Sequence, residues 1–429
     1  GWNVARENFW KPLESVVNQF KLRGSWGELG NQNTSNLYPF YEILPVKSNS
    51  GNWLVNGGKT NTADIPSLVS TLLTWERVRS FNVGFDFGAF SNRLTGSFDY
   101  FVRKTVDMVG PAPQLPLVLG IAPAIVNNAD MKSYGFEIEL SWRDRIGEVD
   151  YGVKFNLADA QQKVVKYPNT TNAFNDWYAG KMSGEIWGYT SLGIAKTDEE
   201  MKEHLASLPN GGQNQLGNKW GAGDIMYADI NGDGKVDGGK GTLADPGDQR
   251  IIGNSTPRYN FGLVLDASYK GFDVSIFFQG VGKRDYAPIV GTNGAVFWGA
   301  VNNIWQSMAM EEHFDYFRPE GHPMGANLNG YYPRPDFTSN KNHQVQTRYL
   351  QDASYIRLKN LQIGYTLPKQ WINKLHINRC RVYVSGDNLW TGTSLASMFD
   401  PETLAAGDWG SGKTYPLSKV ISFGLNVNF

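Results

Sequence analysis

The sequence predicts an all-β fold, a transmembrane antiparallel β-barrel with long extracellular loops. Three observations predict it. Apolar and polar residues alternate with a period of two in segment after segment, strand-like runs often reach twelve or more residues, and connections alternate strictly between short and long. Soluble strands are most often about five to six residues long, so the run lengths favour strands that cross a bilayer.

The composition agrees with many strands joined by tight turns. Aromatic residues make up 13%, there are 48 glycines, and charged residues reach only 19%, below the usual level of about a quarter. With a net charge of -1, nothing argues for a nucleic-acid partner, and the single cysteine, Cys380, cannot form an internal disulfide. No apolar run approaches the ~20 residues that a membrane helix needs.

Alternation is clearest in three segments. "ISFGLNVNF" (421–429) places Ile, Phe, Leu, Val and Phe on one face and Ser, Gly, Asn and Asn on the other. "YGFEIELSW" (134–142) and "FGLVLDASY" (261–269) follow the same pattern, and each apolar face ends in an aromatic residue. Each segment is therefore expected to be a strand with one apolar and one mostly polar face.

The connections provide a test of topology, because membrane barrels have short periplasmic turns and long extracellular loops. Short connections are expected at 89–94, 143–149, 269–272 and 367–378, and long ones at 31–75, 111–129, 166–257, 286–348 and 391–418. Strands running toward the periplasm are then expected at 76–90, 130–143, 258–269, 349–367 and 419–429. Those running outward are expected at 20–30, 94–110, 149–165, 272–285 and 379–390. With a possible partial strand at 1–4, the prediction is an incomplete barrel of about ten to eleven strands.

Five segments carry a further signal. They are "TWERVRSFNVGFDFGAFSNRLTGSFDYFVRKTVDMV" (74–109), "GDIMYADINGDGKVD" (223–237), "IIGNSTPRYNFGL" (251–263), "SYIRLKNLQIGYTLP" (354–368) and "YPLSKVISFGLNVNF" (415–429). These segments resemble the SusC/RagA family, TonB-dependent transporters of the Bacteroidetes outer membrane. The opening residues 1–32 are also similar to the family's mid-barrel region. The matches occur in family order over nearly the whole chain.

The resemblance implies a barrel of 22 strands with an N-terminal plug, in which residues 1–429 are the C-terminal part. The plug, the segment that contacts TonB and the first barrel strands would then lie outside this sequence. It also implies active, TonB-coupled import of a bulky nutrient across the outer membrane, with an oligosaccharide as the first expectation and a peptide as the next. A SusD-like surface lipoprotein is the expected partner, and no enzymatic activity is expected.

The stretch "DINGDGKVD" (229–237) matches the opening of a calcium-binding loop. Oxygen-bearing side chains at alternate positions precede Gly234, which suits the sharp turn of such loops. The twelfth position is Lys240, which cannot ligate; in the similar family an acidic residue stands just before Gln-Arg, so Asp248 is the expected closing ligand and Asp245 the second choice. The expected calcium ligands are Asp229, Asn231, Asp233, the Lys235 carbonyl, Asp237 and Asp248. A turn rich in Gly, Asp and Asn that holds no metal is the alternative.

The long loops also contain many aromatic residues, which stack well on sugar rings and peptides. They are Trp177, Tyr178, Trp187, Tyr189, Trp220, Trp298, Trp305, Tyr331 and Tyr332. Packing inside large ordered loops is expected for most of them. Glu137 and Glu139 alternate on one strand and are expected to line a polar lumen rather than to form a hydrolase pair.

Two other functions remain open at this point. The first is a passive or adhesive outer-membrane barrel, which a plug and a TonB-contact segment in the full-length gene would argue against. The second is a secreted, β-rich, glycan-active enzyme held by a calcium clip, which would be soluble without detergent.

Overall fold

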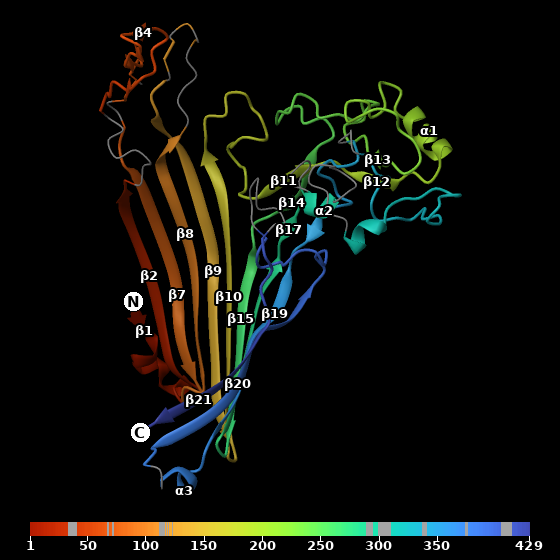
Figure 1. The fold of residues 1–429 in the computed structure, drawn as a ribbon. Coiled ribbons are helices and arrows are strands. Elements are labelled where there is room, and N and C mark those ends of the chain that lie inside the picture. The colour runs from red at the N-terminus through yellow and green to blue at the C-terminus, as the bar shows by residue number, and fades with distance from the viewer. Residues whose placement is uncertain are drawn as a thin grey trace.

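The computed structural model describes residues 1–429 except 33–40, 67, 71–72, 111–115, 117, 119, 122, 289–294, 299–309, 337–340, 374–375 and 405–413. Its main feature is an 11-stranded antiparallel sheet, called the wall below (Figure 1). The wall consists of β1 (Trp2–Asn3), β2 (Val17–Asn31), β7 (Glu76–Ala89), β8 (Leu94–Gly110), β9 (Val126–Ile146), β10 (Val149–Lys166), β15 (Arg258–Tyr269), β16 (Phe272–Lys283), β19 (Tyr355–Thr366), β20 (Arg379–Thr393) and β21 (Val420–Asn428).

The strands of the wall are hydrogen-bonded in sequence order, from β1 at one edge to β21 at the other. No pairing within the described residues joins these two edges, so the described sheet is open, as predicted. The ten long strands all lie where the sequence places them. Several ends differ from the prediction by three or four residues: β9 begins at Val126 rather than 130 and β2 at Val17 rather than 20. The largest error is the strand expected from residue 349, which begins at Tyr355. Tyr349 and Ala353 are instead buried in an apolar cluster, and Gln351–Asp352 (β18) pairs with Asp285–Tyr286 (β17).

Short and long connections lie at opposite ends of the wall, as the topology test requires (Figure 1). The turn between β15 and β16 contains two residues, Lys270 with φ 44° and Gly271 with φ 91°. Positive φ at both positions is the signature of a type I′ turn, which matches the twist of the adjoining strands. This turn therefore fixes the register between β15 and β16.

The two faces of the wall differ in chemistry. On one face Phe423 and Leu425 are 85% and 64% exposed, which fits contact with lipid rather than water. Aromatic side chains such as Phe85 and Phe98 stack on this face, with ring centroids 5.6 Å apart. No helix among the described residues is both long and apolar enough to cross a bilayer.

The opposite face has ion pairs that span several strands. Arg23 on β2 reaches past Gly84 on β7 to the Asp99 carboxylate on β8, with Nη2 to Oδ2 at 2.7 Å. A Cβ atom at Gly84 would stand 2.5 Å from Asp99 Oδ1, so only glycine leaves room for this pair. Arg381 on β20 likewise passes over Gly364 to pair with Asp273 on β16, with Nε to Oδ1 at 2.9 Å.

The long connections contain small elements of their own. Short strands form the pairs β3–β6 (Val46–Lys47, Thr62–Ala63), β4–β5 (Leu54–Val55, Gly58–Lys59), β11–β14 (Glu185–Gly188, Arg250–Asn254) and β12–β13 (Ser191–Ile194, Ile225–Tyr227). The helices are α1 (Asp198–Ala206), α2 (Ala295–Trp298) and α3 (Lys369–Ile372), with 3-10 turns at Val4–Arg6, Asn8–Leu13 and Glu311–Phe314. The described parts of 167–254, 285–354 and 394–404 pack together and are called the loop assembly.

Candidate functional site

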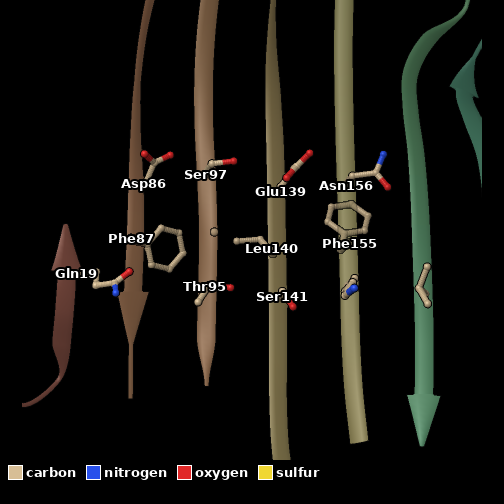
Figure 2. Close-up of a pocket in the computed structure, with 13 residues that line it drawn as sticks. Gln19, Asp86, Phe87, Thr95, Ser97, Glu139, Leu140, Ser141, Phe155 and Asn156 are labelled. Atoms are coloured by element: carbon tan, nitrogen blue, oxygen red, sulfur yellow. The ribbon is translucent and has the colours of Figure 1, made fainter. Parts of the chain in front are cut away.

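Polar side chains form continuous rows across the inner face of the wall. Strand register places Asp86 opposite Ser97, Ser97 opposite Glu139, and Glu139 opposite Asn156. Figure 2 shows these four side chains side by side on four neighbouring strands. Glu139 therefore lies on the polar face of the wall, the face that is expected to line the lumen.

A hollow of about 540 Å³ lies over this part of the inner face. Its polar lining is supplied by Gln19, Asp86, Thr95, Ser97, Glu139, Ser141, Lys154 and Asn156. Neither Glu139 nor Lys154 has an ion-pair partner in the described part of the chain. The hollow thus offers hydroxyl, amide and charged groups of both signs to an aqueous solute.

The loop assembly has an apolar core, a cluster of buried side chains that, among the described residues, contains no member of the wall strands. Tyr189, Tyr227, Phe297, Tyr349 and Phe399 are among its buried members, and they come from all three long connections. Burial raises the pKa of Tyr189 to about 12 and raises that of Tyr227 well above its ordinary value. The phenols therefore stay neutral. A buried apolar core stabilises the loop assembly, as it does in water-soluble domains.

Asp224 joins two of these connections from a fully buried position. Its carboxylate accepts hydrogen bonds from Arg334 Nε at 2.8 Å, Arg334 Nη2 at 2.7 Å, Lys341 Nζ at 2.8 Å and Asn342 Nδ2 at 2.9 Å. Lys341 is itself only 1% exposed. Sequence reasoning missed this cluster, because Asp224 lies 110 residues or more from its side-chain partners in the chain.

The last long connection is fastened to the wall by a second buried cluster. Arg357 on β19 donates to Asp400 at 2.8 Å and to Glu402 at 2.6 Å, and Lys359 donates to Glu402 at 2.6 Å. Burial opposes the charge on Asp400, but hydrogen bonds from the Glu402 N–H and the Arg357 guanidinium hold the pKa of Asp400 below its ordinary value. Residues 394–404 are therefore held against the extracellular end of the wall.

The first half of the predicted calcium loop has the turn geometry expected of such loops. Asp229 accepts hydrogen bonds from Gly232 N at 2.7 Å and Gly234 N at 2.9 Å. Asn231 accepts from Asp233 N at 3.0 Å, and Asp233 accepts from Lys235 N at 3.1 Å. These contacts bring the alternate side chains onto one side of a tight turn, and their oxygens are the hard donors that calcium prefers.

The two carboxylates expected from the second half of the loop are engaged in other contacts. Asp237 is paired with the Lys235 ammonium, which lowers the pKa of its carboxyl against the opposing effect of burial. Asp248 accepts hydrogen bonds from Ile230 N at 2.7 Å, Asn231 N at 3.3 Å and Asp237 N at 2.8 Å. Within the described residues, no group of three or more His, Cys, Asp or Glu side chains is arranged to share a metal ion. Calcium binding here stays a prediction.

Most of the loop aromatics serve packing. Tyr189, Trp298 and Tyr332 are buried in the core of the loop assembly, and Trp220 and Tyr331 pack against it. Trp187 stacks on Phe174 with centroids 4.6 Å apart, and Tyr178 donates to Glu185 at 2.6 Å. Trp177 is 39% exposed, and Trp305 lies outside the described residues.

Comparison with known proteins identifies the family. The family model described as "TonB dependent receptor-like, beta-barrel" matches residues 8–389. The chain belongs to this family. The family places the wall in the outer membrane.

Relatives cover the whole of this chain. TonB-dependent receptor P3 of Formosa agariphila is 29% identical over 458 residues, with 100% of this chain and 41% of the relative aligned. TonB-dependent receptor SusC of Bacteroides thetaiotaomicron is 21% identical over 445 residues, with 100% and 39% aligned. The structure of the RagAB peptide transporter superposes with a TM-score of 0.72 at 22% identity, covering 100% of this chain and 42% of that chain. The chain therefore spans about two-fifths of the length of these relatives.

Proposed function

We propose that this chain forms part of the wall and extracellular mouth of a TonB-coupled importer of a bulky nutrient. The observation that carries the proposal is the polar inner face, where rows of acidic, amide and hydroxyl groups run across β7 to β10 beside a hollow of about 540 Å³. A lining of this kind suits a hydrated solute, and family membership supports active transport.

An oligosaccharide is the first candidate substrate and a peptide the second. Hydroxyl and amide groups such as those of Ser97, Ser141 and Asn156 suit sugar hydroxyls, whereas the unpaired charges of Glu139 and Lys154 suit peptide termini. The likeness to RagAB, described as a peptide transporter, supports a peptide as the second candidate substrate. The SusC and RagAB likenesses also support a SusD-like surface lipoprotein as partner and energy input from the TonB complex.

Uptake by whole cells tests the proposal. Cells that express the full-length protein should accumulate a fluorescent oligosaccharide or oligopeptide, and the gene deletion should abolish that uptake. Dissipating the proton-motive force should stop uptake as completely as the deletion does. Uptake that persists without the proton-motive force would indicate a passive barrel, and surface retention without uptake an adhesive one.

We also propose that the turn at 229–235 takes up a calcium ion once the Lys235 ammonium leaves Asp237. Asp229, Asn231, Asp233, the Lys235 carbonyl, Asp237 and Asp248 would be the ligands. Replacing Asp229 and Asp233 with Ala should abolish calcium binding measured by calorimetry and increase hydrogen exchange over 223–250, with the wall unchanged. Equal calcium binding by this variant and by the parent protein would rule out the site.

A further inference from the structure

A row of basic side chains crosses the outer face of the wall near its extracellular end. Register places Arg79 on β7 opposite Lys104 on β8, Lys104 opposite Lys132 on β9, and Lys132 opposite Lys163 on β10. Four cations thus stand at one height on four neighbouring strands, and they are called the basic row.

The basic row lies on the membrane face. Side chains two residues apart on a strand share a face, so the row shares its face with Phe81, Val102, Tyr134 and Gln161. These four are themselves aligned in register, one step nearer the periplasm. Phe81 is 46% exposed and Val83, one further step down, is 44% exposed. The basic row therefore marks the extracellular edge of the apolar band, the depth of the lipid headgroups.

The charges of this row are mostly not neutralised by the protein. Arg79 donates to Glu28 at 2.6 Å, but Lys104, Lys132 and Lys163 have no carboxylate within ion-pair distance among the residues that the structure describes. Lys132 Nζ lies 4.9 Å from the centroid of the Tyr134 ring. Like charges directly opposite one another on paired strands destabilise a sheet, so an anion is needed to balance them.

On the inner face of the same strands Arg23 is held by both Asp86 and Asp99, although Lys154 there has no carboxylate partner among the described residues. The three unpaired lysines of the row lie on the side that faces lipid. Adjacent strands lie about 4.8 Å apart, so the three lysines span roughly 10 Å, enough for a headgroup with more than one phosphate.

We propose that the basic row binds the phosphates of an anionic glycolipid in the outer leaflet, whose acyl chains cover the apolar band beneath it. The positive charges of the row attract a negatively charged headgroup. The adjoining apolar surface at Phe81, Val102 and Tyr134 would contact acyl chains, which favours a lipid over a soluble anion. Tyr134 stands between the two zones, as aromatic residues do at membrane interfaces. The protein would carry a lipid at a fixed position on its perimeter.

Binding of bisphosphorylated lipid A to the purified full-length protein in detergent tests the proposal. The variant Lys104→Gln, Lys132→Gln, Lys163→Gln removes three charges from the row. Each lysine near an anionic headgroup contributes about fivefold in affinity, so the triple variant should bind about a hundredfold more weakly. The control Lys59→Gln, Lys196→Gln, Lys202→Gln removes three exposed lysines from extracellular connections and should leave the affinity unchanged.

Two further measurements distinguish the possible ligands and show whether a loss of binding comes from misfolding. The variant with Arg at positions 104, 132 and 163 keeps the charges and should restore binding, and dephosphorylated lipid A should bind the parent protein weakly. Equal affinity of the Gln variant and the control for lipid A would overturn the proposal. So would competition by inorganic phosphate at the concentrations at which lipid A binds, because that result would indicate a site for a free anion.

Discussion

The wall and the loop assembly are built from one chain but follow different rules. In the wall, each strand pairs with its neighbours in sequence order, apolar side chains such as Phe423 and Leu425 point outward, and the inner face carries ion pairs that cross several strands. In the loop assembly, aromatic side chains from three distant connections are buried together around fully buried Asp224. The difference reflects the solvent: lipid surrounds the first, and water the second.

The comparison predicts that Asp224→Ala damages the loop assembly and spares the wall. Removing the carboxylate takes away the nearest counter-charge of the buried Lys341 ammonium, at 2.8 Å, and leaves the more distant Asp336 carboxylate at 3.9 Å. Breaking a buried pair in this way destabilises by about 3–5 kcal/mol in typical cases. Hydrogen exchange should rise over 186–254 and 310–354, while heat-modifiable migration of the barrel on gels stays unchanged.

Glu203→Ala, an exposed acid on α1, is the matched control and should alter neither measurement. If Asp224→Ala also abolished barrel migration, the two regions would be one cooperative unit, and the comparison would fail.

The wall should respond to charge on one face only. Leu425→Arg places a cation toward the lipid and should destabilise by ~2–4 kcal/mol, whereas Asn426→Arg, which faces the lumen, should have a much smaller effect. Urea unfolding of the barrel in vesicles measures both. Similar effects at the two positions would contradict the assignment of the faces.

A smaller effect is expected when the pH is lowered, because the contact between residues 394–404 and the wall depends on the charge of Asp400. Because the folded-state pKa of Asp400 lies below its ordinary value, its contribution is complete above the ordinary Asp pKa of about 3.9. It should be lost as the pH falls through the depressed value. Hydrogen exchange over 394–404 should therefore rise between pH 4 and lower values, and Arg357→Gln should move the onset toward higher pH. An onset unchanged by Arg357→Gln would exclude the Arg357–Asp400 pair as the cause.

The smallest effect is expected at the exposed loop aromatic Trp177. Trp177→Ala should change the thermal stability of the loop assembly by no more than ~0.5 kcal/mol, as for other surface substitutions. Tyr349→Ala, in the core, should cost about 3–5 kcal/mol. Differential scanning calorimetry with the barrel left intact separates the two. A large loss at Trp177 would show that this part of 167–254 is packed more like the core.

The wall was readable from the sequence because its determinants are local. A period of two, an aromatic residue at the end of an apolar face and a two-residue turn such as Lys270–Gly271 can each be seen within a dozen residues. The loop assembly was not readable, because Asp224 finds Arg334 and Lys341 more than 100 residues away. The same reason explains the wrong start of β19, since Tyr349 and Ala353 are held by distant apolar partners. In the predicted calcium loop, the turn formed by Asp229, Asn231 and Asp233 was visible locally, but the pairing of Asp237 with Lys235 was not.

The shared core of the loop assembly also sets an order of folding. Tyr227 lies in the first of its three connections, Phe297 and Tyr349 in the second, and Phe399 in the last. The hairpin β15–β16 separates the first connection from the second, and β19–β20 separates the second from the last. Contacts across such long stretches of chain form slowly, because loop closure precedes the gain from burial. The core is therefore incomplete until the chain beyond β20, which contributes Leu395, Phe399 and Leu404, is in place. The outer mouth of this protein is completed last, after the hairpins beneath it have joined.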